Sequence, residues 1–137
     1  MPLSPLPEVH FTYCNACYDN NLEAVKLAIA NPELPLDSKA MGFYMACSNG
    51  FLDIVKYLED KINLDESVRG PLWEYALQGA SHNTKGKKNP VRDYILNEKK
   101  LVISESMDYW LRENNLKDVL GEIKKRDEGK ENKKIKP

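Results

Sequence analysis

Three cysteines and one histidine have types and spacings that could support metal or redox chemistry. Cys14 and Cys17 form a Cys-x-x-Cys pair, and His10 lies four residues before Cys14, on the same side of an expected helix. Cys47 follows Cys17 by 30 residues. Thiolates and imidazoles are typical zinc ligands, and paired cysteines can form a redox couple. These four residues are the candidates for a metal- or redox-linked sensor.

The same residues also fit a structural role. A structural zinc site usually has a second paired cluster, and a redox pair of the thioredoxin kind follows a β-strand, but this sequence has neither feature. Cysteine also packs as a small hydrophobic residue. We therefore predict no bound metal and no cofactor, and the sensor is kept as an alternative. His82 has no nucleophile or carboxylate motif to pair with, so we predict that the protein is not an enzyme.

Lysines gather at two places in the second half of the chain. Lys85, Lys87 and Lys88 lie in a glycine-containing stretch without the interleaved aromatic residues that stack on nucleic-acid bases. Residues 127–137 mix both signs of charge and have no apolar periodicity, so we predict a charged, disordered tail there. Residues 1–70 hold 10 acidic and 5 basic side chains, which disfavours a nucleic-acid partner.

The composition is that of an ordinary globular domain. Of the 137 residues, 42% are hydrophobic and 30% are charged, which is unlike the composition of disordered chains. No apolar run approaches the roughly 20 residues of a membrane-spanning helix. The three cysteines show no disulfide-scaffold spacing, so we expect a reducing intracellular compartment, the cytoplasm, with the nucleus as an alternative.

A period of 30 residues organises the first half of the chain. Tyr13, Phe43 and Trp73 are spaced by this interval, and each precedes by three residues an alanine of the same spacing: Ala16, Ala46 and Ala76. Within each unit, apolar residues recur at helical spacing, as in Phe51, Ile54, Val55 and Leu58. The pattern predicts two short helices per unit, joined by a tight turn at Asn20 or Gly50.

The stretch FYMACSNGFLDIVKYLED, from Phe43, strongly resembles an ankyrin repeat. The match is good in the preceding unit and weaker after Trp73. The resemblance implies an all-α fold, an ankyrin-like solenoid of helix-turn-helix repeats with about eight short helices. We place the units at about 9–38, 39–68, 69–102 and 103–126. The third and fourth are atypical, with about six extra residues in the third unit's turn and Trp110 at the alanine position of the fourth.

The resemblance also implies a function. Ankyrin repeats bind proteins through their connecting loops and the exposed face of each first helix, so we expect a protein-binding module, an adaptor or inhibitor. An alternative is a small viral or bacterial effector acting through the 79–90 loop. The acidic lean of the implied face predicts a partner with a basic patch. The candidate binding residues are Asp37, Ser38, Lys39, Met41, Tyr44, Ser48, Glu66, Ser67, Arg69, Glu74, Gln78, Lys85, Lys87 and Lys88.

Overall fold

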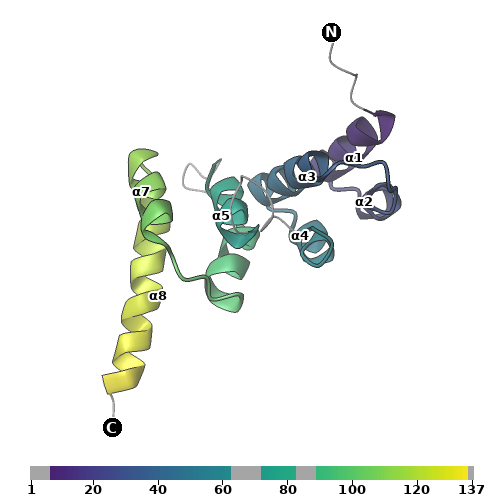
Figure 1. Ribbon diagram of the computed structural model, residues 1–137. Coiled ribbons are helices and arrows are strands. Elements are labelled where there is room, and N and C mark those ends of the chain that lie inside the picture. The colour runs from purple at the N-terminus through teal and green to yellow at the C-terminus, as the bar shows by residue number, and fades with distance from the viewer. Residues whose placement is uncertain (1–6, 63–71, 83–88, 136–137) are drawn as a thin grey trace.

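The computed structural model describes residues 7–62, 72–82 and 89–135, apart from the side chains of His82 and of residues 129–135. This part of the chain is helical and holds no β-strand, which confirms the predicted all-α class. Its eight α-helices form four successive pairs (Figure 1). No helix within the described ranges is both long and apolar enough to cross a lipid bilayer.

Each pair consists of two helices that are consecutive in the chain. The first pair is α1 (Glu8–Tyr18) with α2 (Leu22–Ile29), and the second is α3 (Leu36–Asn49) with α4 (Leu52–Leu58). The third is α5 (Leu72–His82) with α6 (Pro90–Asp93), which continues into the π-helical segment η1 (Tyr94–Glu98). The fourth is α7 (Glu105–Glu113) with α8 (Lys117–Ile135). Helix α3 begins inside the range predicted for the first unit.

The same turn joins the two helices in three of the pairs. Asn20, Gly50 and Asn115 have positive φ angles of 59°, 75° and 56°. The residue after each donates its backbone N–H to the carbonyl five residues earlier, over 2.9–3.0 Å. Glycine and asparagine are the residues that adopt this left-handed conformation most readily, and this bond pattern ends a helix. The sequence therefore sets the length of each first helix through one residue.

This turn corrects the alignment of the fourth pair. The carbonyls that accept these bonds belong to Ala16, Ala46 and Leu111, so Leu111 occupies the place of the two alanines. We predicted Trp110 at this place, which is wrong by one residue. Leu111 is fully buried, whereas Trp110 is half-buried at the edge of the core.

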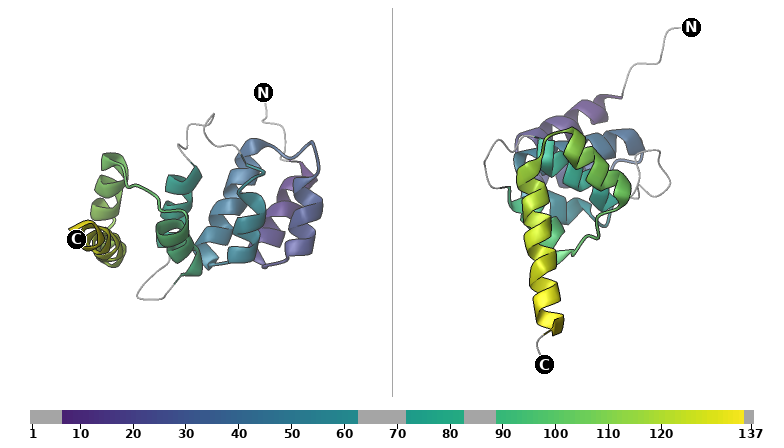
Figure 2. Two further views of the ribbon diagram at one scale, coloured as in Figure 1. Left: turned by 90° about the horizontal axis from the view of Figure 1, so that it is seen from below. Right: turned by 90° about the vertical axis from the view of Figure 1, so that its left-hand side faces the viewer.

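The first helices of the first three pairs form a row in which α1 packs on α3 and α3 packs on α5 (Figure 2). Glycine permits the close approach at both contacts. A methyl group at Gly42 would overlap the Tyr13 ring and lie 2.8 Å from Cys17 Sγ. A methyl group at Gly79 would lie 3.1 Å from Cys47 Cβ. These distances are shorter than van der Waals contacts between such atoms.

The glycines also show that the third pair is displaced from the predicted register. Gly79 follows Gly42 by 37 residues, and the buried Val91 follows the buried Ile54 by the same interval. Trp73 and Ala76, at an interval of 30, are therefore not the equivalents of Phe43 and Ala46. The extra residues lie in the connection between α4 and α5, and our placement of about six of them in the turn after α5 is wrong.

Lysine–tyrosine contacts tie the second helices together at matching positions. The Lys26 ammonium lies 5.4 Å from the centre of the Tyr57 ring, and that of Lys56 lies 5.2 Å from the Tyr94 ring. Lys26 and Lys56 are 30 residues apart, and Tyr57 and Tyr94 are 37 residues apart. The second interval is the one that separates Gly42 from Gly79. The first pair thus contacts the second, and the second contacts the third, through a cation–π interaction.

The fourth pair docks differently. Met107 occupies the place of Gly42 and Gly79, and its buried side chain prevents a similar approach, so α7 does not pack on α5 as α5 packs on α3. Helices α7 and α8 stand apart from the row in Figure 2. Val119 and Ile123 of α8 are buried in the core, and polar contacts add to this packing. Arg92 donates to Glu122 over 2.9 Å, and Arg126 donates to the carbonyls of Leu96 and Leu101.

The end of the chain is more regular than we predicted. Helix α8 continues to Ile135, so the part of the predicted disordered tail that the structure describes is helical. Apolar periodicity does stop at Ile123, but the following residues are mostly Lys, Glu and other residues with adequate helix propensity. They extend a helix that has already been nucleated by the packing of its first turns.

Asn89 joins three helices at one point. Its side-chain amide donates to the carbonyls of Cys47 and Ala80, at the ends of α3 and α5, over 2.9 and 3.2 Å. Its side-chain oxygen accepts from the backbone N–H groups of Val91 and Arg92, which caps α6. The side chain is buried, so these partners have no access to bulk water.

We expect Gly42→Ala to lower the free energy of unfolding by about 1–3 kcal/mol, because the new methyl group overlaps the Tyr13 ring. The matched control is Gly121→Ala, where an added Cβ meets no atom within 4 Å. That variant should gain roughly 0.5–1 kcal/mol from helix propensity. Denaturant titrations of both variants measure the difference, and equal stabilities would contradict the close contact.

We expect Asn89→Ala to cost on the order of 3 kcal/mol, since it removes a helix cap and takes one donor from each of two buried carbonyls. Asn21→Ala is the comparison, because Asn21 only caps α2, through the N–H of Ala24 at 3.1 Å, and is exposed. That variant should cost about 1 kcal/mol. Chemical denaturation of the two variants measures the loss in the free energy of unfolding for each. An equal loss in both would contradict the larger contribution of the buried Asn89 side chain.

Candidate functional site

The first helices of the row share one face that no described helix covers. Along a helix with about 100° per residue, Phe11 and Tyr18 point in nearly the same direction. The intervals of 30 and 37 residues place Met41 and then Gln78 beside Phe11, and Ser48 beside Tyr18. We call these five residues the first-helix face. The opposite sides of α1, α3 and α5 pack into the core.

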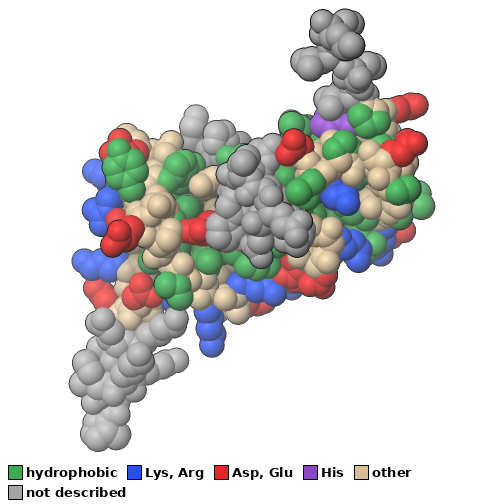
Figure 3. Space-filling view, in the orientation of Figure 1, with side chains coloured by type: hydrophobic (Ala, Val, Ile, Leu, Met, Phe, Trp, Pro, Cys, Tyr) green, Lys and Arg blue, Asp and Glu red, His purple; other side chains and the backbone are tan. Residues whose placement is uncertain are grey.

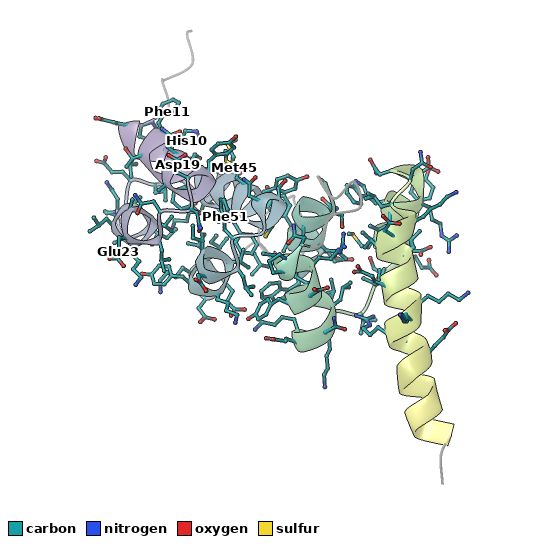
Figure 4. All side chains as sticks on the ribbon, turned by 180° about the vertical axis from the view of Figure 1, so that it is seen from behind. His10, Phe11, Asp19, Glu23, Met45 and Phe51 are labelled. Atoms are coloured by element: carbon teal, nitrogen blue, oxygen red, sulfur yellow. The ribbon has the colours of Figure 1, made fainter. Side chains whose placement is uncertain are left out.

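Large apolar side chains are exposed on this face. Phe11 is 54% exposed, Tyr18 60% and Met41 46%. Figure 4 labels Phe11 on α1 and Met45 on α3, both on the side of these helices away from α2 and α4. Tyr44 lies at the border of the face, with its ring centre 5.2 Å from that of Tyr75, and burial raises its pKa. Such amphipathic and apolar side chains are enriched at the centres of protein interfaces.

Carboxylates line one edge of the first-helix face. Asp37 on α3 and Glu74 on α5 are 37 residues apart and so occupy equivalent positions. Glu74 also accepts a hydrogen bond from the hydroxyl of Ser104, the residue that caps α7. The space-filling view shows hydrophobic and acidic side chains together over α1 and α3 (Figure 3). This edge therefore adds negative charge beside an apolar surface.

The structure separates the residues that we predicted to bind a partner. It brings together Asp37, Met41, Tyr44, Ser48, Glu74 and Gln78 on the first-helix face or its edge. Ser38 is only 2% exposed and bonds to His10, so its assignment to a binding surface is wrong. Lys39 is half-buried, and its carbonyl accepts the hydroxyl of Tyr13. The remaining predicted residues lie outside the described part: Glu66, Ser67, Arg69, Lys85, Lys87 and Lys88.

Three residues of this surface were missing from our predicted set. Phe11 and Tyr18 lie on α1, and Met45 lies beside Tyr44 on α3. The signal was present in the sequence, because the 30-residue interval that we used for the core also relates Phe11 to Met41 and Tyr18 to Ser48. Applying the interval to exposed positions would have identified Phe11 and Tyr18.

The cysteine and histidine side chains form a buried cluster between α1 and α3. His10 Nδ1 and Ser38 Oγ share a hydrogen bond of 2.6 Å, and Cys14 Sγ lies 4.0 Å from His10 Nε2. All three cysteines are free and buried. Within the described ranges, no group of three or more His, Cys, Asp or Glu side chains is arranged to hold a metal ion. The geometry thus gives no support to the metal-linked alternative.

Burial also reduces the reactivity of the thiols. It raises the pKa of Cys17 to about 12 and that of Cys14 above its usual value. Burial and the neighbouring Cys17 raise the pKa of Cys47 well above the usual value. The thiolate is the nucleophilic and metal-binding form, so neutral thiols in the core behave as packing groups.

We expect the free energy of unfolding to fall as the pH rises from about 9 toward 12. The folded state favours the neutral thiol, so the stabilisation from Cys17 is complete below its ordinary pKa of 9.0 and is lost above it. Each such thiol contributes a slope of about 1.4 kcal/mol per pH unit. Denaturation at several pH values under reducing conditions measures this slope. Cys17→Ala should reduce this slope by the contribution of one thiol. An unchanged slope would contradict the raised pKa of Cys17 in the folded state.

Comparison of the chain with protein-family models, with curated proteins and with solved structures finds no match.

Proposed function

We propose that this chain is a non-catalytic protein-binding module of the ankyrin type, which holds a partner protein on the first-helix face. The observation that carries the proposal is the row of exposed Phe11, Tyr18 and Met41 on adjoining helices. Exposed apolar side chains gathered on one face are a typical mark of an interaction surface. The opposite sides of these helices pack into one buried apolar cluster, which supports the face.

Three features support the ankyrin-type assignment. The chain is built of consecutive helix pairs, the turn at Asn20 recurs at Gly50 and Asn115, and the first helices of the first three pairs lie in a row. The sequence resemblance is strongest in the second pair, where all of these features meet. The fourth pair, with Met107 in place of glycine, serves in this proposal as a terminal cap.

The charges favour a particular class of partner. Asp37 and Glu74 border the apolar side chains, and Lys39 is the one basic residue of the predicted set within the described part of the chain. We propose a partner that presents an apolar patch bordered by lysines or arginines. Opposite charges accelerate the encounter of two proteins, so the association rate should fall as the salt concentration rises. The free thiols support a place in a reducing compartment, the cytoplasm.

We expect Phe11→Ser and Met41→Ser each to weaken partner binding by about tenfold or more, because each removes an apolar contact at the centre of the face. The partner is first captured from an extract of the source organism and identified by mass spectrometry. Its affinity for each variant is then measured by titration at two salt concentrations. Glu74→Ala is less suitable, because it also removes the contact with Ser104.

The control is Val102→Ser, which alters an equally apolar side chain that is 81% exposed in the segment before α7. It should bind like the unaltered protein. Both face variants should unfold at the same denaturant concentration as the unaltered protein, because their side chains lie outside the core. Unchanged affinity in both face variants would remove the first-helix face from consideration.

A further inference from the structure

A second surface lies at the outer side of the first pair. A groove of about 450 Å³ runs between α1 and α2, lined mainly by Glu8, Val9, Thr12, Ala24, Leu27 and Ala28. Leu27 is 79% exposed there, although it belongs to an otherwise well-packed helix. Among the described residues, none from α3 to α8 lines this groove.

The equivalent surface of the second pair is covered by a helix. Thr12 corresponds to Gly42, 30 residues later, and the Tyr13 ring and Cys17 of α1 press on Gly42. In the same way Val9 corresponds to Lys39, whose carbonyl accepts the Tyr13 hydroxyl. The groove therefore has the shape of a surface that receives a helix elsewhere in this protein.

The contact at Leu27 extends this comparison. The residues at its equivalent positions are Tyr57 and Tyr94, and each of them lies under the ammonium of a lysine from the preceding pair. Each ring also lies near a lysine that follows it in the chain, Lys61 at 4.5 Å from Tyr57 and Lys99 at 5.5 Å from Tyr94. A lysine of the preceding pair thus shares in covering this position twice, and the aliphatic stem of a lysine can pack on an apolar surface. No such lysine is found over Leu27 in the described part of the chain.

The charges at the groove indicate the same kind of occupant. Glu8 and Glu33 are its two charged lining residues, and both are acidic. A second copy of this chain, placed groove to groove, would bring these carboxylates together, which is unfavourable. A helix with an apolar stripe and flanking lysines would match both the apolar floor and the acidic rim.

We propose that the groove between α1 and α2 is a second docking site, which receives an amphipathic, lysine-rich helix of a partner protein. It is separate from the first-helix face, so one chain can hold two partner segments at once. A module with two such surfaces acts as an adaptor. The proposal does not require the first-helix face to bind.

The test uses the full chain, labelled with ¹⁵N, and a synthetic helix of about 18 residues made of Leu, Lys and Ala with Leu at helical spacing. Addition of this peptide should shift the amide resonances of residues 8–12 and 24–33. A matched peptide with Glu in place of Lys should not bind. Leu27→Gln should weaken binding by about tenfold, and Val102→Gln, which alters an equally exposed apolar residue, should leave it unchanged.

Glu8→Gln with Glu33→Gln should remove most of the salt dependence of binding. Three results would overturn the proposal: shifts confined to the first-helix face, equal affinity of the Leu27→Gln variant, or no binding by the lysine peptide. Analytical sedimentation can give a fourth result that would overturn the proposal. If the chain self-associates and Leu27→Gln abolishes that association, a second copy is the occupant. None of these results removes the first-helix face as a binding site, so the two proposed sites fail independently.

Discussion

The close approach of successive first helices is the constraint on which the rest of this structure depends. Gly42 and Gly79 each leave room for side chains of the preceding helix, Tyr13 and Cys17 in one case and Cys47 in the other. Once α1, α3 and α5 are this close, the second helices also meet, and lysines reach the next tyrosine rings. Where Met107 replaces glycine, the row ends, and arginine side chains add polar contacts to the apolar packing of the fourth pair.

The same constraint explains why exposed residues fall into rows. Side chains that point away from the core on α1 and α3 repeat at a fixed interval. Phe11 and Met41 are therefore neighbours on the surface although they lie 30 residues apart in the sequence. A binding surface made in this way lies on a rigid support, which limits the entropy lost when a partner binds. The proposed groove follows from the same geometry, because it is the receiving surface of the first pair.

The helical class and the first two pairs could be predicted, because apolar spacing and the residues at positions 20 and 50 act locally. The register of the third pair could not. The coincidence of Trp73 and Ala76 with the 30-residue interval favoured the wrong alignment, whereas the glycine contact that decides it is a tertiary feature. The burial of Ser38 was missed for a similar reason, because its partner His10 lies on another helix. The ankyrin relationship stays a prediction.

Nuclear Overhauser effects at the two glycines test the central claim most directly. Close packing of the three helices should give cross-peaks from the Gly42 α-protons to the Tyr13 ring and from the Gly79 α-protons to the β-protons of Cys47. The 30-residue alignment would instead place Leu72 against Cys47. Cross-peaks from Leu72 to Cys47, with none from Gly79, would contradict the stacked arrangement described above.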